Sequence, residues 1–119
     1  MIRGLDREYY YRFPTSAGIR TKFDHLEVDN CELAGWSHAA IYLVSGREHL
    51  IHHNYIHHNQ RNALGYGMTF DAASGLVEAN LFNANRHSIA GSGSPGCSYE
   101  ARNNVEYGVS MYHCFDMHG

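Results

Sequence analysis

The sequence predicts an all-β solenoid of about four coils, and three observations support that prediction. A six-residue pattern, apolar-x-x-(Asn or Cys)-x-apolar, recurs along the chain. Its copies lie at a nearly constant spacing, as expected when each copy belongs to one turn of a stacked coil. Glycine and serine gather between the copies, where the chain must turn. The copies are Val28–Leu33, Ile51–Ile56, Val77–Phe82 and the weaker Ala101–Glu106.

The fourth position of the pattern is expected to form a column along the solenoid. Stacked asparagine amides bond to the coils above and below them, and asparagine tolerates left-handed backbone angles better than most residues. We therefore expect the asparagines both to form a ladder and to make the turn at the corner. Cys31, Asn54, Asn80 and Asn104 occupy the column, one to each coil, and Asn59 and Asn85 follow as a second set.

The expected elements follow in order from this repeat. Residues 1–20 are the least regular and are predicted to form a leading segment or a partial coil. The repeats then cover 21–119. Their first stretch, Thr21–Leu33, alternates apolar and polar residues and should hold the first clear strand. Residues 41–44 are expected to form the second strand of that coil, and residues 45–48 the turn into the next.

Each later coil is expected to repeat this plan. Strands are predicted near 67–70, 88–90 and 114–117, where apolar residues recur. Loops are predicted over 71–75 and 91–96, which are rich in glycine, serine and alanine. We expect these loops to lie above one another, because loops inserted in successive repeats gather on one side of a solenoid.

Composition argues against several functional classes. The 119 residues fit one domain, and the net charge of −3 argues against nucleic acid as a partner. No apolar run approaches the ~20 residues that cross a bilayer, so no membrane partner is expected. The start lacks the apolar core of a signal peptide. The localisation is therefore unknown from this chain, and an extracellular or periplasmic place is expected only for a full-length parent protein.

The ends of the chain suggest a fragment. An open solenoid end exposes core residues and unpaired strand edges, and no amphipathic helix that could cover the start is predicted. We therefore expect a β-solenoid truncated at one or both ends.

The cysteines and most histidines do not predict a metal centre. Cys31, Cys97 and Cys114 have no CxxC spacing, so neither a zinc site nor a disulfide framework is expected. The pairs at 52–53 and 57–58 flank inward positions and are expected to point outward, onto a solvated face. A metal-binding protein built on these pairs is kept as a third hypothesis.

A strip of polar residues is the candidate site. His38, Arg61, His87 and His113 each lie a few residues before the second strand of their coil. Stacking should bring them onto one face at intervals of roughly 5 Å. Asp71, Asp116 and His118 lie at the far end of the same strands, and the Asp-x-His spacing places the last two on one side of a strand. The predicted catalytic residues are His87, Arg86, Asp116, His118 and Asp71, and the predicted substrate-binding residues are Arg61, His38, His113 and Tyr66.

This set of side chains suits cleavage of an acidic polysaccharide. Arginine neutralises a uronate carboxylate, and histidine or tyrosine serves as base or acid near neutral pH. Carboxylates could instead form the acid and base pair of a hydrolase. The structural alternative is that Arg86 and His87 only end a bend and bond to loop carbonyls. Asp116 and His118 would then anchor loops, and Asp71 would only start its turn.

The stretch Leu50–Asn59, LIHHNYIHHN, resembles the right-handed parallel β-helix repeat proteins of the pectate lyase-like superfamily. The resemblance covers roughly residues 21–119 and implies a right-handed parallel β-helix. It also implies a carbohydrate-active protein with a polysaccharide or oligosaccharide partner, by lyase or hydrolase chemistry. The alternative is a non-catalytic surface or carbohydrate-binding module. No cofactor is expected; calcium is the alternative left open, although no motif supports it. No catalytic set is carried over, since the repeat residues form the coil rather than an active site.

Overall fold

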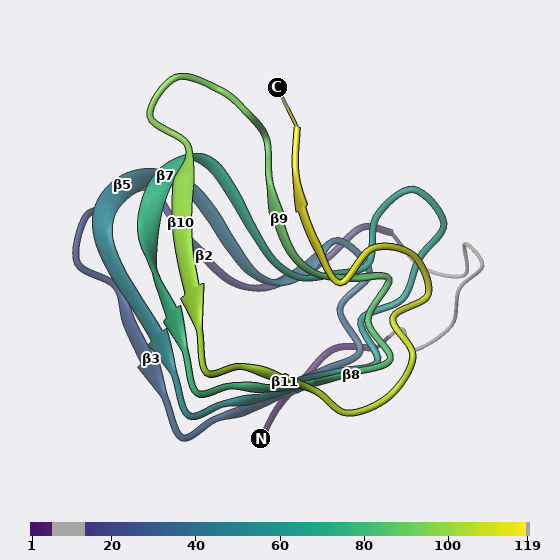
Figure 1. Cartoon of the computed structure of the whole chain (residues 1–119). Coiled ribbons are helices and arrows are strands. Elements are labelled where there is room, and N and C mark those ends of the chain that lie inside the picture. Colours follow the sequence, from purple (N-terminus) through teal and green to yellow (C-terminus); the bar gives the residue numbers. More distant parts are fainter. Residues whose placement is uncertain (6–13, 119) are drawn as a thin grey trace.

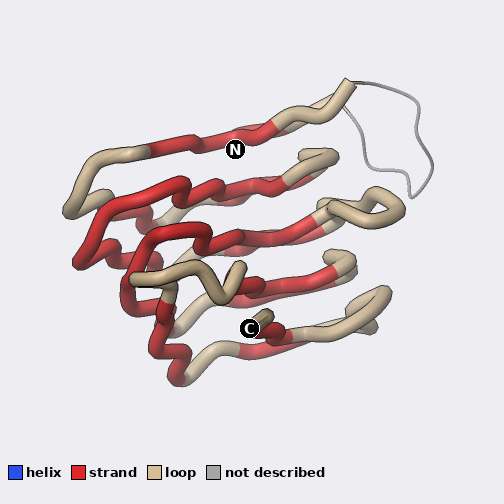
Figure 2. Tube along the Cα trace, turned by 90° about the horizontal axis from the view of Figure 1, so that it is seen from above, coloured by secondary structure: helices blue, strands red, loops and turns tan. Residues whose placement is uncertain are grey.

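The computed structural model describes residues 1–5 and 14–118, which form a stack of parallel β-coils with a three-sided cross-section (Figures 1 and 2). The described residues measure 33 × 25 × 23 Å along their principal axes. They include no helix that is long and apolar enough to cross a membrane. Part of the predicted leading segment, residues 6–13, lies outside the described residues, as does residue 119.

Two parallel sheets build the three sides. The first sheet forms one side, with the strand order β1-β4-β6-β8-β11. The second has the order β12-β9-β7-β5-β2 and is extended by β3 on β5 and β10 on β7, so it covers the other two sides. The strands are β1 (Ile2–Arg3), β2 (Ala17–Thr21), β3 (Glu27–Asp29), β4 (Glu32–Ala34), β5 (Ala39–His52), β6 (Tyr55–His57), β7 (Tyr66–Glu78), β8 (Leu81–Asn83), β9 (His87–Gly91), β10 (Ser98–Arg102), β11 (Val105–Glu106) and β12 (Phe115–Met117).

The strands predicted over 67–70, 88–90 and 114–117 correspond to β7, β9 and β12. The stretch 21–33, predicted to hold the first clear strand, holds β3 and the start of β4, because the chain turns a corner at Asn30. The strand β2 precedes that stretch and pairs with β5, so part of the leading segment already lies in a coil.

The loop predicted over 71–75 is wrong, because it lies inside a long strand. The turn predicted over 45–48 is present as a bend within another long strand rather than as a break between two strands. In β5, the positive φ angles of Gly46 and Glu48 and a register shift bend the strand while pairing continues on both sides of the bend. In β7, the stretch pairs with β5, and its last residues also pair with β10. Ladder pairing satisfies the backbone polar groups that a loop would leave open. The predicted loop over 91–96 is present largely as the connection from β9 to β10.

The asparagine column is confirmed as a ladder of hydrogen bonds, buried at its centre and partly buried at its two ends. The Oδ1 atom of Asn80 accepts from the backbone N–H of Asn54 at 3.0 Å and from its side-chain amide at 3.0 Å. Asn104 does the same for Asn80, and the N–H of Cys31 donates to Asn54. Each Nδ2 atom also donates to a backbone carbonyl, for example that of Ile51 for Asn80. The ladder therefore joins successive coils at this corner.

The asparagines do not make the turn themselves, contrary to the prediction. The residue before each ladder position has the positive φ angle, as in Asn30, His53, Ala79 and Asn103. That left-handed residue turns the chain and directs the next side chain inward, where its amide meets the neighbouring coils. The second set follows the same rule, since His58 and Ala84 precede Asn59 and Asn85, which bond to each other at 2.9 Å.

The core is made of apolar columns that follow the strand registers. Leu33, Ile56 and Phe82 stack along the first sheet and are fully buried. Matching columns on the other two sides complete the interior. Burying each such side chain contributes about 1.5–3 kcal/mol to the stability of the fold. This core therefore keeps the strands β7, β9 and β12 in register with one another. The other two columns are Ile41–Met68–Ile89 and Val28–Ile51–Val77.

Candidate functional site

The predicted strip lies over the side formed by β5, β7, β9 and β12. Tyr66 pairs with His87 in the ladder, and Asp116 pairs with Ala90. His113 lies two residues before Phe115, which pairs with Ile89, so it occupies the level of His87 one coil later. The ring centroids of Tyr66 and His87 are 5.3 Å apart, and those of His87 and His113 are 5.5 Å apart. These spacings match the rise from coil to coil.

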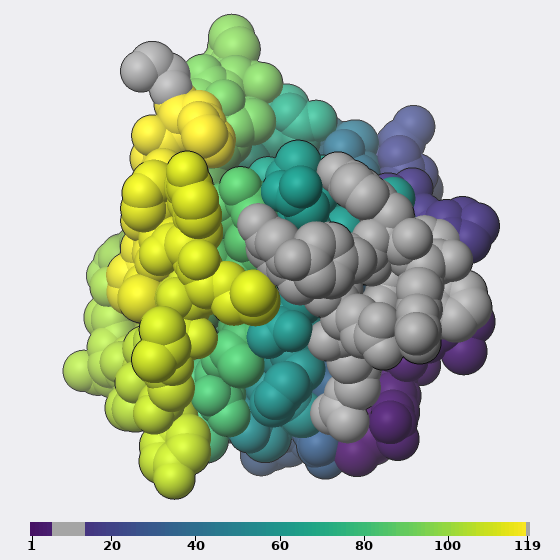
Figure 3. Space-filling view, turned by 90° about the vertical axis from the view of Figure 1, so that its right-hand side faces the viewer, coloured from purple at the N-terminus to yellow at the C-terminus, as the bar shows by residue number. Residues whose placement is uncertain are grey.

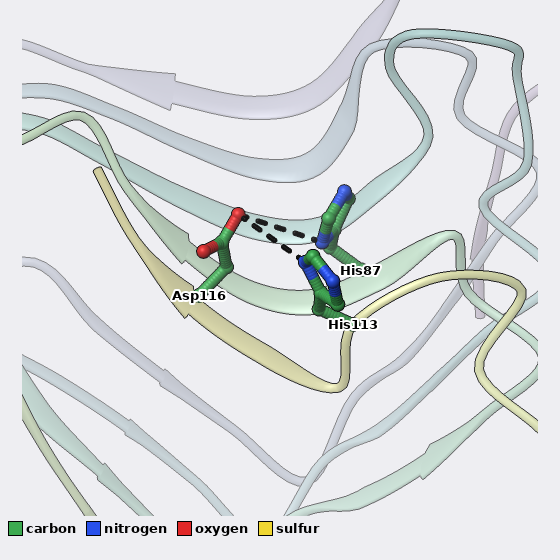
Figure 4. A group of neighbouring side chains, drawn as sticks. All are labelled: His87, His113 and Asp116. Atoms are coloured by element: carbon green, nitrogen blue, oxygen red, sulfur yellow. Dashed lines mark ion pairs between the residues drawn. The ribbon is translucent and has the colours of Figure 1, made fainter.

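His87, His113 and Asp116 converge at the centre of the strip (Figure 4). The Nδ1 atoms of both imidazoles lie 3.9 Å from Oδ2 of Asp116. His87 is 3% exposed, and its Nδ1 atom is buried without a hydrogen-bond partner in the part of the chain that the structure describes. By contrast, the side chain of His113 is 62% exposed. The buried imidazole of His87 and the exposed imidazole of His113 therefore face the same carboxylate, that of Asp116.

His118 is the third imidazole at this carboxylate. Its Nε2 atom lies 3.0 Å from Oδ2 of Asp116, and its side chain is 63% exposed. The Asp-x-His spacing thus brings the two side chains together, and the backbone N–H of His118 is held by the carbonyl of Gly91. A carboxylate that receives a ring N–H orients the imidazole and supports its basicity, which is the arrangement of a general base.

Arg86 supplies a half-buried positive charge beside these groups. Its guanidinium carbon lies 4.8 Å from the ring centroid of Tyr112, and its Nη1 atom is 3.5 Å from the carbonyl oxygen of Leu64. Its Nε atom is buried and has no hydrogen-bond partner within residues 1–5 and 14–118. Tyr112 was not predicted as a site residue. The signal that could have found it is its position in the sequence, one coil further along than Arg86.

Two adjoining hollows run along this side of the solenoid. One, of about 270 Å³, is lined by Arg86, His87, Tyr112, His113, Asp116 and others. The other, of about 260 Å³, is lined by His38, Asp71 and neighbouring residues of β5, β7 and β9. Tyr66 and His118 line both. Figure 3 shows the C-terminal residues, in yellow, along one margin of a face whose preceding coils are green and teal. The hollows form an elongated surface that crosses several coils.

The remaining predicted site residues have different surroundings. His38 lies 4.6 Å from the ring of Tyr42, and burial followed by the charge of Arg20 lowers its pKa. Asp71 accepts a hydrogen bond from the hydroxyl of Ser94, so it anchors the loop after β9 while it lines the second hollow. Arg61 bridges to Leu64 in the turn before β7, and among the described residues it lines neither hollow.

The histidine pairs are not uniformly solvated, which corrects the prediction. His57 belongs to the middle strand of the first sheet and is 5% exposed. Its ring stacks on that of Tyr55, and its Nε2 atom lies 3.0 Å from Oε1 of Glu32. In both pairs the two Nδ1 atoms are 2.8 Å apart, at 52–53 and at 57–58. That distance is a hydrogen bond between rings, too short for an ion to lie between the two nitrogens.

Burial makes His87 difficult to protonate. Burial, followed by the charge of Arg86, lowers the pKa of the imidazole to about 4. The carboxylate of Asp116 acts in the opposite direction, but its effect is smaller. His87 is therefore neutral at pH 7.

Lowering the pH through the range 6.5 to 4 is expected to destabilise the fold through His87. The unfolded chain binds a proton near 6.5, whereas the folded chain binds it only near 4. The unfolded state thus holds more protons in this range. As the pH falls from 6.5 to 4, the free energy of unfolding therefore decreases by about 2–3 kcal/mol. Urea unfolding of the wild type and His87→Gln at several pH values measures this. The variant should lose less stability over the range, and identical pH profiles would contradict the assignment.

Comparison with known proteins defines the family. A family model described as a right-handed beta helix region matches residues 12–118. The chain belongs to this right-handed β-helix family. No curated protein and no solved structure matches it. The membership agrees with the parallel ladders and stacked coils of this β-helix protein, and it leaves the chemistry of the strip to be argued from the side chains.

Proposed function

We propose that this β-helix protein binds an acidic polysaccharide along the two hollows and cleaves it by β-elimination. The observation that carries the proposal is the convergence of Arg86, Asp116 and His118 on one open surface. A purely structural role for these residues predicts that each bonds to loop backbone and leaves no hollow. With respect to the described residues, only Arg86 among the three has a side-chain contact of that kind, to the carbonyl of Leu64.

The roles follow from charge and exposure. Arg86 neutralises the uronate carboxylate, which makes the proton on the adjacent ring carbon easier to remove. His118, held by Asp116 at 3.0 Å, is the accessible base. Tyr66 and Tyr112 present aromatic rings along the surface, where sugar rings stack.

The reaction balances without a co-reactant. His118 takes the proton from C5 of the uronate. The electron pair of that C–H bond becomes the C4–C5 double bond, while the bond from C4 to the glycosidic oxygen breaks. The departing oxygen takes a proton from water, and His118 returns its proton to the solvent. The products are a new chain end and an unsaturated uronate.

The positions of the carboxylates in the two hollows agree better with elimination than with hydrolysis. A glycoside hydrolase uses two carboxyl groups that flank one bond. Asp116 is the carboxylate in the hollow that contains Arg86, whereas Asp71 lines the adjoining hollow and is engaged by Ser94. Among the described residues of these two hollows, the groups gathered around Asp116 are imidazoles and a guanidinium rather than a second carboxylate.

The test is an assay of the chain on uronate polymers and on neutral glucans. We expect cleavage of uronate polymers alone, with the ultraviolet absorbance of an unsaturated product. Arg86→Gln should lower kcat/KM by about 10²-fold or more, since a charge-assisted contact is lost. New reducing ends without the absorbance would indicate hydrolysis. Binding without either product would support the non-catalytic module instead.

A further inference from the structure

A second property of the strip concerns its ability to hold a metal ion. One potential ligand atom from each of His87, His113 and Asp116 lies within 4.8 Å of the other two. The two distances to the carboxylate oxygen are each 3.9 Å. The three side chains come from β9, from the segment before β12 and from β12 itself, so two successive coils form the cluster (Figure 4).

An independent feature of His87 points to a missing ligand. Its Nδ1 atom is buried, faces the cluster and has no hydrogen-bond partner among the described residues. Buried polar atoms of native proteins are nearly always paired, and leaving one unpaired is destabilising. A cation between this nitrogen, His113 and Asp116 would give it the partner that the protein does not provide.

We propose that His87, His113 and Asp116 bind one divalent first-row transition ion, such as Zn²⁺. Ligand bonds of about 2.0–2.2 Å require ligand atoms roughly 3.0–3.6 Å apart, so the cluster needs a contraction of about 1 Å. His113 can supply it by rotation because its side chain is 62% exposed. Three protein ligands leave a coordination position open toward the hollow, as in catalytic rather than structural zinc sites.

The ligand types favour this class of ion over calcium or magnesium. Two imidazole nitrogens and one carboxylate suit zinc, cobalt, nickel or copper, whereas calcium requires six to eight oxygen ligands. His118 contacts the same carboxylate at 3.0 Å and would orient it from outside the ligand set. Arg86 lies beside His87 and repels a cation, so its charge weakens binding.

The experiment uses the full chain freed of metal by a chelator. Zn²⁺ is titrated in by calorimetry, and Co²⁺ is added separately to report coordination through its visible spectrum. We expect one ion per chain. His113→Ala should weaken binding at least tenfold, and His118→Ala by roughly tenfold as a supporting residue. Because both side chains are largely exposed, these variants should fold, and circular dichroism checks that they do. Arg86→Gln should strengthen binding.

Matched controls separate this site from the histidine pairs and from the proposed activity. His53→Ala removes an imidazole from another side of the solenoid and should leave the affinity unchanged. Absence of binding, binding unaffected by His113→Ala, or binding lost in His53→Ala would each overturn the proposal. The proposal does not rest on polysaccharide cleavage. Arg86→Gln distinguishes the two, since it should reduce cleavage but increase metal affinity.

Discussion

Replacing Asn80 by alanine is expected to lower the free energy of unfolding by about 4 kcal/mol, a large fraction of the roughly 5–15 kcal/mol typical of a domain. The side chain of Asn80 accepts from the backbone N–H of Asn54 and donates to the carbonyl of Ile51. Asn54 and Asn80 are buried, so water cannot replace these bonds. Each unpaired buried group costs about 1–3 kcal/mol. Urea unfolding followed by circular dichroism measures the change.

Asn83→Ala is the matched control for the ladder. Asn83 belongs to β8, and its amide donates to the hydroxyl of Tyr55 rather than to the backbone of another coil. Its loss should cost about 1 kcal/mol. If the two variants were equally stable, the ladder would not be the main link between coils at this corner.

The largest effect on the proposed activity is expected for His118→Ala, which should lower kcat by about 10²–10⁴-fold on uronate polymers. His118 is the exposed imidazole oriented by Asp116, and its removal leaves no accessible base that this carboxylate holds at hydrogen-bond distance among the described residues. Stability should hardly change, because the side chain is largely exposed. Initial rates of product absorbance, measured with and without saturating Zn²⁺, separate loss of the base from loss of a bound ion.

His25→Ala is the control for this prediction. His25 is similarly exposed and also contacts a carboxylate, that of Glu48 at 3.1 Å, but it lies at a different corner of the solenoid. The activity of His25→Ala on uronate polymers should match that of the wild type. Full activity of His118→Ala would show that another group removes the proton, and comparable losses in both variants would show that neither acts through the chemistry of the strip.

The candidate site could be predicted in part because a solenoid converts sequence spacing into position. His87 and His113 are one coil apart in the sequence, so their stacking followed from the repeat alone. The Asp-x-His spacing likewise placed Asp116 and His118 on one side of β12. Side-chain reach does not follow from spacing. Two contacts depend on loops whose paths the repeat does not determine. They are the position of the Arg86 guanidinium over the Tyr112 ring and the hydrogen bond from Ser94 to Asp71.

Local composition was a poor guide wherever neighbouring coils supplied hydrogen bonds. Residues 71–75 have the composition of a loop, yet pairing with β5 and β10 makes them part of β7. Histidine is usually found at the surface, yet His57 is buried, with its ring stacked on Tyr55 and its Nε2 atom beside Glu32. In each case tertiary contacts outweighed the intrinsic preference of the segment.

The amino-acid sequence by itself determined the repeat length, the asparagine columns and the apolar columns inside them, because these depend only on which residues recur at coil spacing. Only the tertiary structure decided that the residue before each asparagine takes the left-handed turn. It also decided that His87 is buried, with its Nδ1 atom near Asp116 and unpaired among the residues described. The physical reason is that backbone angles at a corner and the burial of a polar atom are set by the coils stacked on either side, which a single repeat does not contain.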